Sequence, residues 1–99
     1  MAHIPLHILH GLKNKRGKME LKDTIELMNS EDYRERFKAE YYQTKIRYDK
    51  LHNIIIKMEA GTCNFAPTCS LEILKEQAKH MGIYLHILEV RAQIERVKL

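Results

Sequence analysis

The chain contains few residues that break helices or form covalent crosslinks. Its 99 residues include only two prolines, four glycines and two cysteines. A chain of this length forms one domain at most, and it buries only a modest core. The hydrophobic content of 44% is too high for a disordered protein and is ordinary for a soluble helical one.

The sequence also lacks long apolar runs and an export signal. No apolar run approaches the roughly 20 residues that cross a bilayer. The first residues place apolar side chains before basic ones, which is the reverse of a secretory signal. We therefore expect a cytoplasmic protein without a membrane partner, in which Cys63 and Cys69 are reduced thiols.

The N-terminal segment lacks acidic residues. Residues 1–18 carry four basic side chains and no acidic one, although the whole chain has a formal net charge of +4. The remaining residues therefore balance 13 basic against 13 acidic groups. We expect a basic arm over residues 1–18, either flexible or an extension upstream of a natural start at Met19, and a single domain over residues 19–99. The neutral body argues against binding of duplex nucleic acid.

A short amphipathic helix is expected first in this domain. Over residues 20–28, Leu21, Ile25 and Met28 share one side at helical spacing. Ser30 then suits the N-cap position of the next helix.

Two long helices are expected after it. The first is predicted over residues 31–60 and is ended by Gly61, which suits a left-handed C-terminal cap. Pro67 interrupts the following linker, and Ser70 can cap a second helix over residues 71–97.

Both long helices carry a heptad repeat of apolar side chains. In the first, the seam residues are Phe37, Tyr41, Thr44, Tyr48, Leu51, Ile55 and Met58, with Tyr33 one step earlier. In the second, they are Leu71, Leu74, Ala78, Met81, Leu85, Leu88 and Ala92. Such seams predict an all-α fold, a long antiparallel helical hairpin with a coiled-coil-like contact.

Each long helix has more apolar surface than one seam can bury. Off-seam apolar residues include Tyr42, Ile46, Ile54, Ile56, Ile73, Ile83, Tyr84, Ile87 and Val90. The short helix, the N-terminal segment or another copy of the chain must cover them. We favour self-association, with a dimer that completes a four-helix bundle.

The chain contains two sets of possible metal ligands, and neither predicts a metal site. Cys63, Cys69, His80 and His86 follow a zinc-like order, but residues six apart on a helix differ by about 240° around its axis. The two histidines therefore cannot hold one ion while both are helical. His3, His7 and His10 would share a helical face, but a mobile arm explains them better. We expect no metal and no cofactor.

Catalytic motifs are lacking as well. The chain has no glycine-rich phosphate loop, no nucleophile elbow and no paired Glu-x-x-His motif of a di-iron bundle. We therefore expect a protein that is not an enzyme and has no catalytic residues.

One stretch combines aromatic and basic side chains. Its candidate binding residues are Arg34, Arg36, Lys38, Tyr41, Tyr42, Lys45 and Arg47. They could stack bases and hold phosphates. The same residues are also consistent with tyrosines of the seam flanked by solvated charges. In addition, the acidic residues between them would repel a nucleic-acid backbone. Binding of a compact anionic ligand, such as a nucleotide held between two protomers, remains an alternative.

The chain resembles a small, uncharacterised family from phages and prophages of Clostridium-like (Firmicutes) bacteria. The resemblance covers residues 19–97 and rests on "MNSEDYRERFKAEYYQTKIRYDKLHNII", "EAGT" and "LEILKEQAKHMGIYLHILEVRAQIE". It implies a phage accessory protein in the bacterial host cytosol, acting by binding.

Three functions follow as hypotheses. The first is inhibition of a host protein, such as an antiviral defence component in the manner of an anti-CRISPR protein. The alternatives are binding of nucleic acid or sequestration of a nucleotide signal, and a structural or assembly role.

Overall fold

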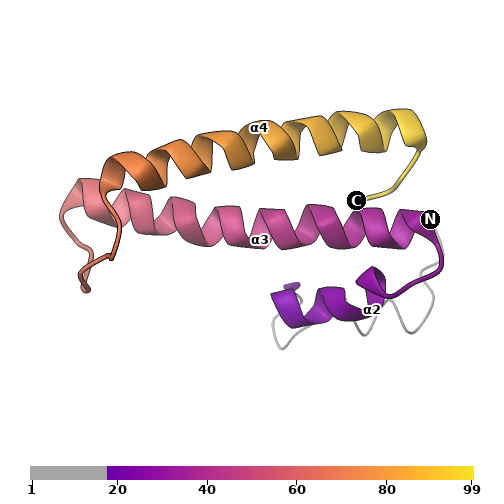
Figure 1. Ribbon diagram of the computed structural model, residues 1–99, viewed down its shortest axis with the longest axis horizontal. Helices are drawn as coiled ribbons and strands as arrows, with labels where there is room; N and C mark the ends of the chain where they lie inside the picture. The colour runs from indigo at the N-terminus through magenta and orange to yellow at the C-terminus, as the bar shows by residue number, and fades with distance from the viewer. Residues whose placement is uncertain (1–17) are drawn as a thin grey trace.

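The computed structural model describes residues 18–99, and they form an antiparallel helical hairpin preceded by a short helical segment. In chain order the elements are the 3-10 helix η1 (Leu21–Thr24) and the α-helices α2 (Ile25–Met28), α3 (Tyr33–Ala60) and α4 (Leu71–Glu95). The short segment lies against α3 on the side away from α4 (Figure 1). The predicted all-α hairpin is confirmed, and the described residues contain no strand. Apart from Lys18, the expected arm lies outside the described residues.

The short segment packs through a different side from the predicted one. Thr24 and Leu27 are buried, whereas Ile25 and Met28 are exposed. The reason is that η1 has three residues per turn, so Leu21, Thr24 and Leu27 align along one side. The predicted apolar side was wrong because it assumed a regular α-helix throughout.

Specific contacts hold this segment on α3. The Thr24 hydroxyl donates to the Leu21 carbonyl at 2.7 Å and accepts from Gln43 Nε2 at 3.1 Å, so this buried polar group is satisfied. Leu27 packs against Ala39 with Met19 beside them. The small side chain of Ala39 leaves room for the close approach of the two elements.

Helix α3 begins two residues later than predicted. The Asp32 carboxylate accepts a hydrogen bond from the Arg34 N–H at 2.9 Å and is therefore the N-cap. Ser30 instead accepts from the Asp32 N–H at 3.1 Å, so its assignment as the N-cap was wrong. The other end is as predicted, because Gly61 has a left-handed conformation with φ of 75°.

Helix α4 starts as predicted and ends two residues early. The Ser70 hydroxyl accepts from the Ile73 N–H at 3.3 Å. At the other end Arg96 adopts a left-handed conformation, with φ of 58°. The Val97 N–H donates to the Ala92 carbonyl at 2.9 Å, and the chain turns back so that Val97 is buried. This turn is what ends the helix before residue 97.

The seam residues differ in depth. Phe37, Ile55, Leu85 and Leu88 are buried, and Tyr48, Leu51, Met58, Leu74 and Met81 are half-buried. The sequence predicted that the seam begins at Tyr33. Because Tyr33 is 45% exposed, the buried part of the seam begins at Phe37 instead.

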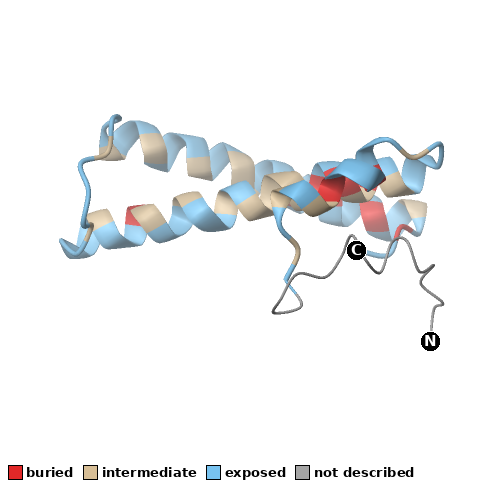
Figure 2. Ribbon diagram, turned by 90° about the horizontal axis from the view of Figure 1, so that it is seen from below, coloured by how far each residue is buried: buried red, intermediate tan, exposed pale blue. Residues whose placement is uncertain are grey.

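The core lies mainly at one end of the hairpin. We call residues 33–48 and 82–97 the closed end, and residues 49–81 the loop end. One cluster at the closed end contains Phe37, Tyr41, Leu85, Leu88, Ala92 and Val97. Figure 2 shows most buried positions gathered there, on the part of α3 that the short segment also covers. At the loop end only the two long helices pack against each other. Among the described residues 49–81, the buried apolar residue is Ile55.

None of the helices in residues 18–99 is both long and apolar enough to traverse a bilayer.

Candidate functional site

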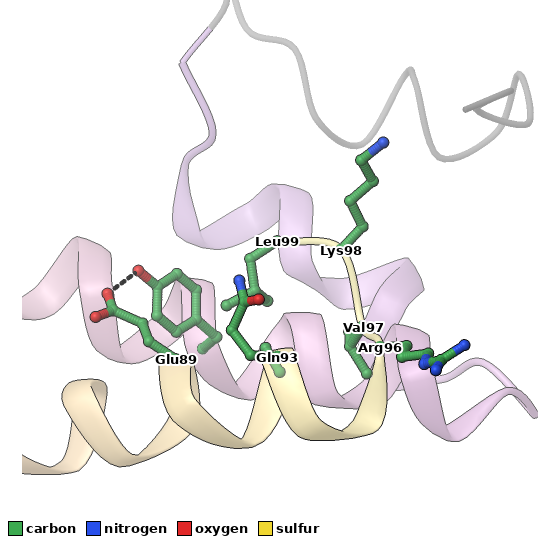
Figure 3. Close-up of a pocket in the computed structure, with 8 residues that line it drawn as sticks. Glu89, Gln93, Arg96, Val97, Lys98 and Leu99 are labelled. Atoms are coloured by element: carbon green, nitrogen blue, oxygen red, sulfur yellow. Dashed lines mark hydrogen bonds between the residues drawn. The ribbon is translucent and has the colours of Figure 1, made fainter. Parts of the chain in front are cut away.

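A hollow of about 540 Å³ lies at the closed end, between α3, the last turns of α4 and the C-terminal tail. Its lining residues are Tyr41, Glu89, Ala92, Gln93, Arg96, Val97, Lys98 and Leu99. Ala92 and Val97 are buried, whereas Glu89, Gln93, Arg96 and Lys98 are exposed. Arg96 and Lys98 point outward at its edge (Figure 3). The hollow therefore joins an apolar base to a polar and partly cationic rim.

Tyr41 supplies the most constrained polar group of the hollow. Its hydroxyl donates a hydrogen bond to Glu89 Oε2 at 2.7 Å, across the hairpin from α3 to α4 (Figure 3). Burial raises the pKa of the Tyr41 hydroxyl well above its usual range, and the hydrogen bond and negative charge of Glu89 raise this pKa further. The hydroxyl therefore stays protonated at neutral pH, and its hydrogen bond orients the Glu89 carboxylate.

Tyr42 supports the Tyr41 ring from the side. The two rings are in edge-to-face contact, with centroids 5.2 Å apart and an interplanar angle of 80°. Burial also raises the pKa of Tyr42. Both rings are thus held in place, and Tyr42 does not itself line the hollow.

The backbone at Arg96 sets the position of the tail. A left-handed residue after a helix is usually glycine, because a side chain is disfavoured in that conformation. Here an arginine takes the position, and the turn it makes brings Val97 into the core and Lys98 and Leu99 to the hollow. An unfavourable backbone position is therefore occupied by a cationic residue at the rim.

Comparison with known proteins shows one family. The family model described as Sequestin matches residues 31–94, which is well over half of the chain. The chain belongs to the Sequestin family. No curated protein and no solved structure matches it. The Sequestin match spans α3 and nearly all of α4, so it includes Tyr41, Glu89 and Gln93 and ends before Arg96.

The name of the Sequestin family is consistent with a binding or sequestering role rather than a catalytic one. It names no target. Of the expected family resemblance, membership of the Sequestin family over residues 31–94 is shown, and an origin in phages of Clostridium-like bacteria stays a prediction.

The candidate binding residues predicted on α3 do not form one surface. Each helical residue turns by about 100°, so Arg34, Lys38 and Lys45 share one flank, whereas Arg36 and Arg47 lie on nearly the opposite side. Tyr41 alone of the seven predicted residues lines the hollow. The linear stretch thus divides over two sides of its helix.

Several of these residues already have local partners. Arg36 donates to the Ser30 carbonyl at 2.7 Å, and Lys45 pairs with Asp49 at 3.1 Å. The Arg34 guanidinium lies 6.0 Å from the centre of the Tyr33 ring. These exposed contacts are typical of solvated helix surfaces and contribute little stability each.

Sequence reasoning missed most of the hollow. Glu89, Gln93, Arg96 and Lys98 all come from the stretch that ends the chain. The available signal was the cluster of cations Arg91, Arg96 and Lys98 near a predicted helix end. The turn at Arg96 could not be foreseen, because no glycine marks it.

The metal-ligand candidates are also placed. Cys63 and Cys69 are free thiols in the loop between the long helices, and His80 Nε2 lies 3.0 Å from Glu76 Oε1 on α4. Within residues 18–99, no three histidine, cysteine or acidic side chains gather in a way that could hold a metal ion. His3, His7 and His10 lie outside the described residues.

Proposed function

We propose that this protein sequesters a small, phosphate-bearing nucleotide signal and releases it chemically unchanged. The observation that carries the proposal is the hollow at the closed end in a chain of the Sequestin family, with Arg96 and Lys98 at its rim. Its volume of about 540 Å³ falls in the range of ligand pockets, roughly 300–1,000 Å³.

Each part of the hollow suits one part of a nucleotide. The guanidinium of Arg96 and the ammonium of Lys98 match phosphate oxygens, with arginine able to bind two oxygens at once. Glu89 Oε2 is occupied by Tyr41, which leaves its second oxygen to accept from a sugar hydroxyl or a base amino group. Gln93 can both donate and accept at the edge of a base.

The setting follows from the same proposal. Removal of a signalling nucleotide would serve a phage protein in the cytosol of a bacterial host, since it would silence an antiviral defence without any catalysed reaction. Nucleic acid fits less well, because the cationic residues of α3 lie on two sides of the helix and no continuous basic face results.

Binding tests this proposal directly. Isothermal titration calorimetry with ATP, cyclic AMP, cyclic di-AMP and NAD as probes should show that one class binds. Mass spectrometry of the released ligand should find it unaltered. Absence of binding by all four probes, or recovery of a converted product, would contradict the proposal.

Arg96→Gly gives a sharp variant for this titration. Glycine favours the left-handed conformation, so we expect the fold to be kept or stabilised. Loss of a charged hydrogen bond should weaken binding by roughly tenfold to a hundredfold. Arg47→Ala is the matched control. It removes an exposed arginine on a different side of α3 from Tyr41, and this variant should bind as the parent does. Equal affinity of the Arg96→Gly variant and the parent would count against this hollow.

A second candidate function is inhibition of a host protein. It is favoured by the exposed apolar side chains of α4, because contiguous apolar surface marks protein interfaces. Capture of one defence protein by the parent, and its loss in Ile87→Glu but not in Arg96→Gly, would favour this function over the first.

A further inference from the structure

The side of α4 that faces away from α3 carries an ordered apolar stripe. Ile83, Ile87, Val90 and Ile94 repeat at spacings of four, three and four residues, and each is between 45% and 74% exposed. In the described chain the short segment packs on α3 and not on α4 (Figure 1). The stripe is therefore a second heptad seam without a partner among residues 18–99.

This stripe differs from scattered surface residues. Single exposed apolar side chains are normal, but an exposed heptad repeat is not. Leu85 and Ile87 are two residues apart and so point about 160° away from each other, since two residues turn a helix by about 200°. Helix α4 is thus apolar on two opposite sides, as expected for a helix packed between two others.

We propose that the stripe binds the same stripe of a second copy, with the two α4 helices antiparallel. A specific interface between two copies needs to bury roughly 1,000 Å² in total. The dimer is then a row of four long helices, with both α4 helices inside and both α3 helices outside. A closed four-helix bundle does not follow, because the two apolar sides of α4 are opposite.

Charge determines the direction of packing. Toward the start of α4 the same heptad positions are occupied by His80, Glu76 and Ile73, and Glu72 lies beside them, so this part of the face carries the carboxylates of Glu72 and Glu76. A parallel pair would place these carboxylates beside those of the second copy, and like charges would repel. An antiparallel pair directs them toward the end of the second chain that carries Arg96 and Lys98.

The antiparallel register also predicts which side chains meet. Centring the stripe pairs Ile83 with Ile94 and Ile87 with Val90 of the second copy. On one flank, Tyr84 then lies beside position 91 of the second copy, where the Arg91 guanidinium is 4.8 Å from the centre of its own Phe37 ring and bonds its own Glu95. On the other flank, His86 faces Gln93 of the second copy, and Lys79 faces its C-terminal tail.

In this register the second copy adds side chains to the hollow. This part of the inference rests on the proposed function. Gln93 and Lys98 line the hollow, so the second copy adds Lys79 and His86 beside its cationic rim. The site is therefore pooled from two chains. Because Lys79 would stand beside Arg96 and Lys98 and like charges repel, a bound phosphate should strengthen the dimer.

Mass measurements test the interface without any ligand. Size-exclusion chromatography with light scattering of the full chain, from micromolar to near-millimolar concentration, should give about twice 11.8 kDa. Ile87→Glu should give the monomer mass. Ile56→Glu is the matched control, because Ile56 is 48% exposed on α3 and Ile87 is 49% exposed on α4, and it should stay dimeric. Circular dichroism should show that both variants are helical.

A strict monomer at every concentration would overturn the interface, and so would dissociation of Ile56→Glu with retention of the Ile87→Glu dimer. Because this measurement uses no nucleotide, it is independent of the titrations above. A dimer that binds no probe would refute the proposed function and leave the interface standing.

Disulfide trapping tests the register in a Cys63→Ser, Cys69→Ser background. His86→Cys combined with Gln93→Cys should form covalent dimers on oxidation, and His86→Cys alone should not. Covalent dimers of Ile87→Cys alone would show parallel packing and would overturn the register. This experiment remains informative even if a charged variant does not fold.

Discussion

The closed end and the loop end of the hairpin share one heptad spacing but differ in burial. At the closed end Leu88 is 1% exposed, and the short segment and the C-terminal tail add further layers around α3. At the loop end Leu51, Met58, Leu74 and Met81 have the same seam positions and are only half-buried. The heptad repeat therefore decides which sides of the helices meet, and a third layer decides how far those sides are shielded from water.

The largest effect should follow from a charge placed in the closed end. Leu85→Asp should lower the free energy of unfolding by several kcal/mol, because it buries an unpaired carboxylate in the main cluster. Thermal and urea denaturation at fixed protein concentration measure it. Ile56→Asp, at an exposed position of the loop end, should melt close to the parent. Equal melting of Leu85→Asp and the parent would contradict the register of the seam.

Truncation of one leucine at each end sharpens the comparison. Leu88→Ala should cost about 2–5 kcal/mol, the range for fully buried leucines. Leu74→Ala should cost about 1 kcal/mol, because Leu74 is half-buried and water can fill the space. Urea denaturation of both variants gives the ratio. Similar losses at the two positions would mean that the loop end is as well shielded as the closed end, for example by a second copy.

The pH dependence reports on the closed end through Tyr41. Since the folded state raises its pKa above the unfolded value near 10, its contribution to stability is complete below about pH 10 and is lost as the pH rises further. The free energy of unfolding should fall by up to about 1.4 kcal/mol per pH unit in that range from this group. Tyr41→Phe should show a shallower decline, with Tyr42 and the other titrating groups unchanged. Identical slopes would mean that Tyr41 ionises freely in the fold.

The smallest effect is expected where the two ends join. A Cβ at Gly82 would lie 3.5 Å from Tyr48 Cε1, an ordinary contact distance. Gly82→Ala should therefore stabilise the protein by about 0.5–1 kcal/mol, since alanine replaces glycine in a helix interior. A higher melting temperature would verify this. Destabilisation would indicate that α3 and α4 approach each other more closely at this point than the structure shows.

Much of the fold could be predicted from the sequence, because heptad spacing and capping residues are local signals. Gly61 and Ser70 mark their helix ends directly, and the seam fixed the pairing of α3 with α4. The side on which the short segment packs could not be read, since a single 3-10 turn shifts the positions of Ile25 and Met28. Local periodicity does not reveal such a turn.

The hollow was less predictable because it depends on one backbone conformation. Of the predicted binding residues, only Tyr41 lines the hollow. The others are neighbours in the sequence but do not share one surface of the folded protein. Arg96 takes a position where sequence rules expect glycine, so the reversal of the tail left no sign in the sequence. The rotation of about 100° per helical residue does predict from the sequence that Arg36 and Arg47 lie on a different side of the helix from Lys45.

The loop between the long helices offers a practical handle. Cys69 is an exposed thiol there, and this loop lies at the opposite end of the hairpin from the last turn of α4 (Figure 1), where the hollow lies. With Cys63 replaced by serine, a thiol-reactive fluorophore could be attached at Cys69 with little risk of blocking ligand entry. Energy transfer between labelled copies would then depend on how the rods are aligned: the antiparallel row holds the two dyes far apart, whereas parallel rods would bring them together.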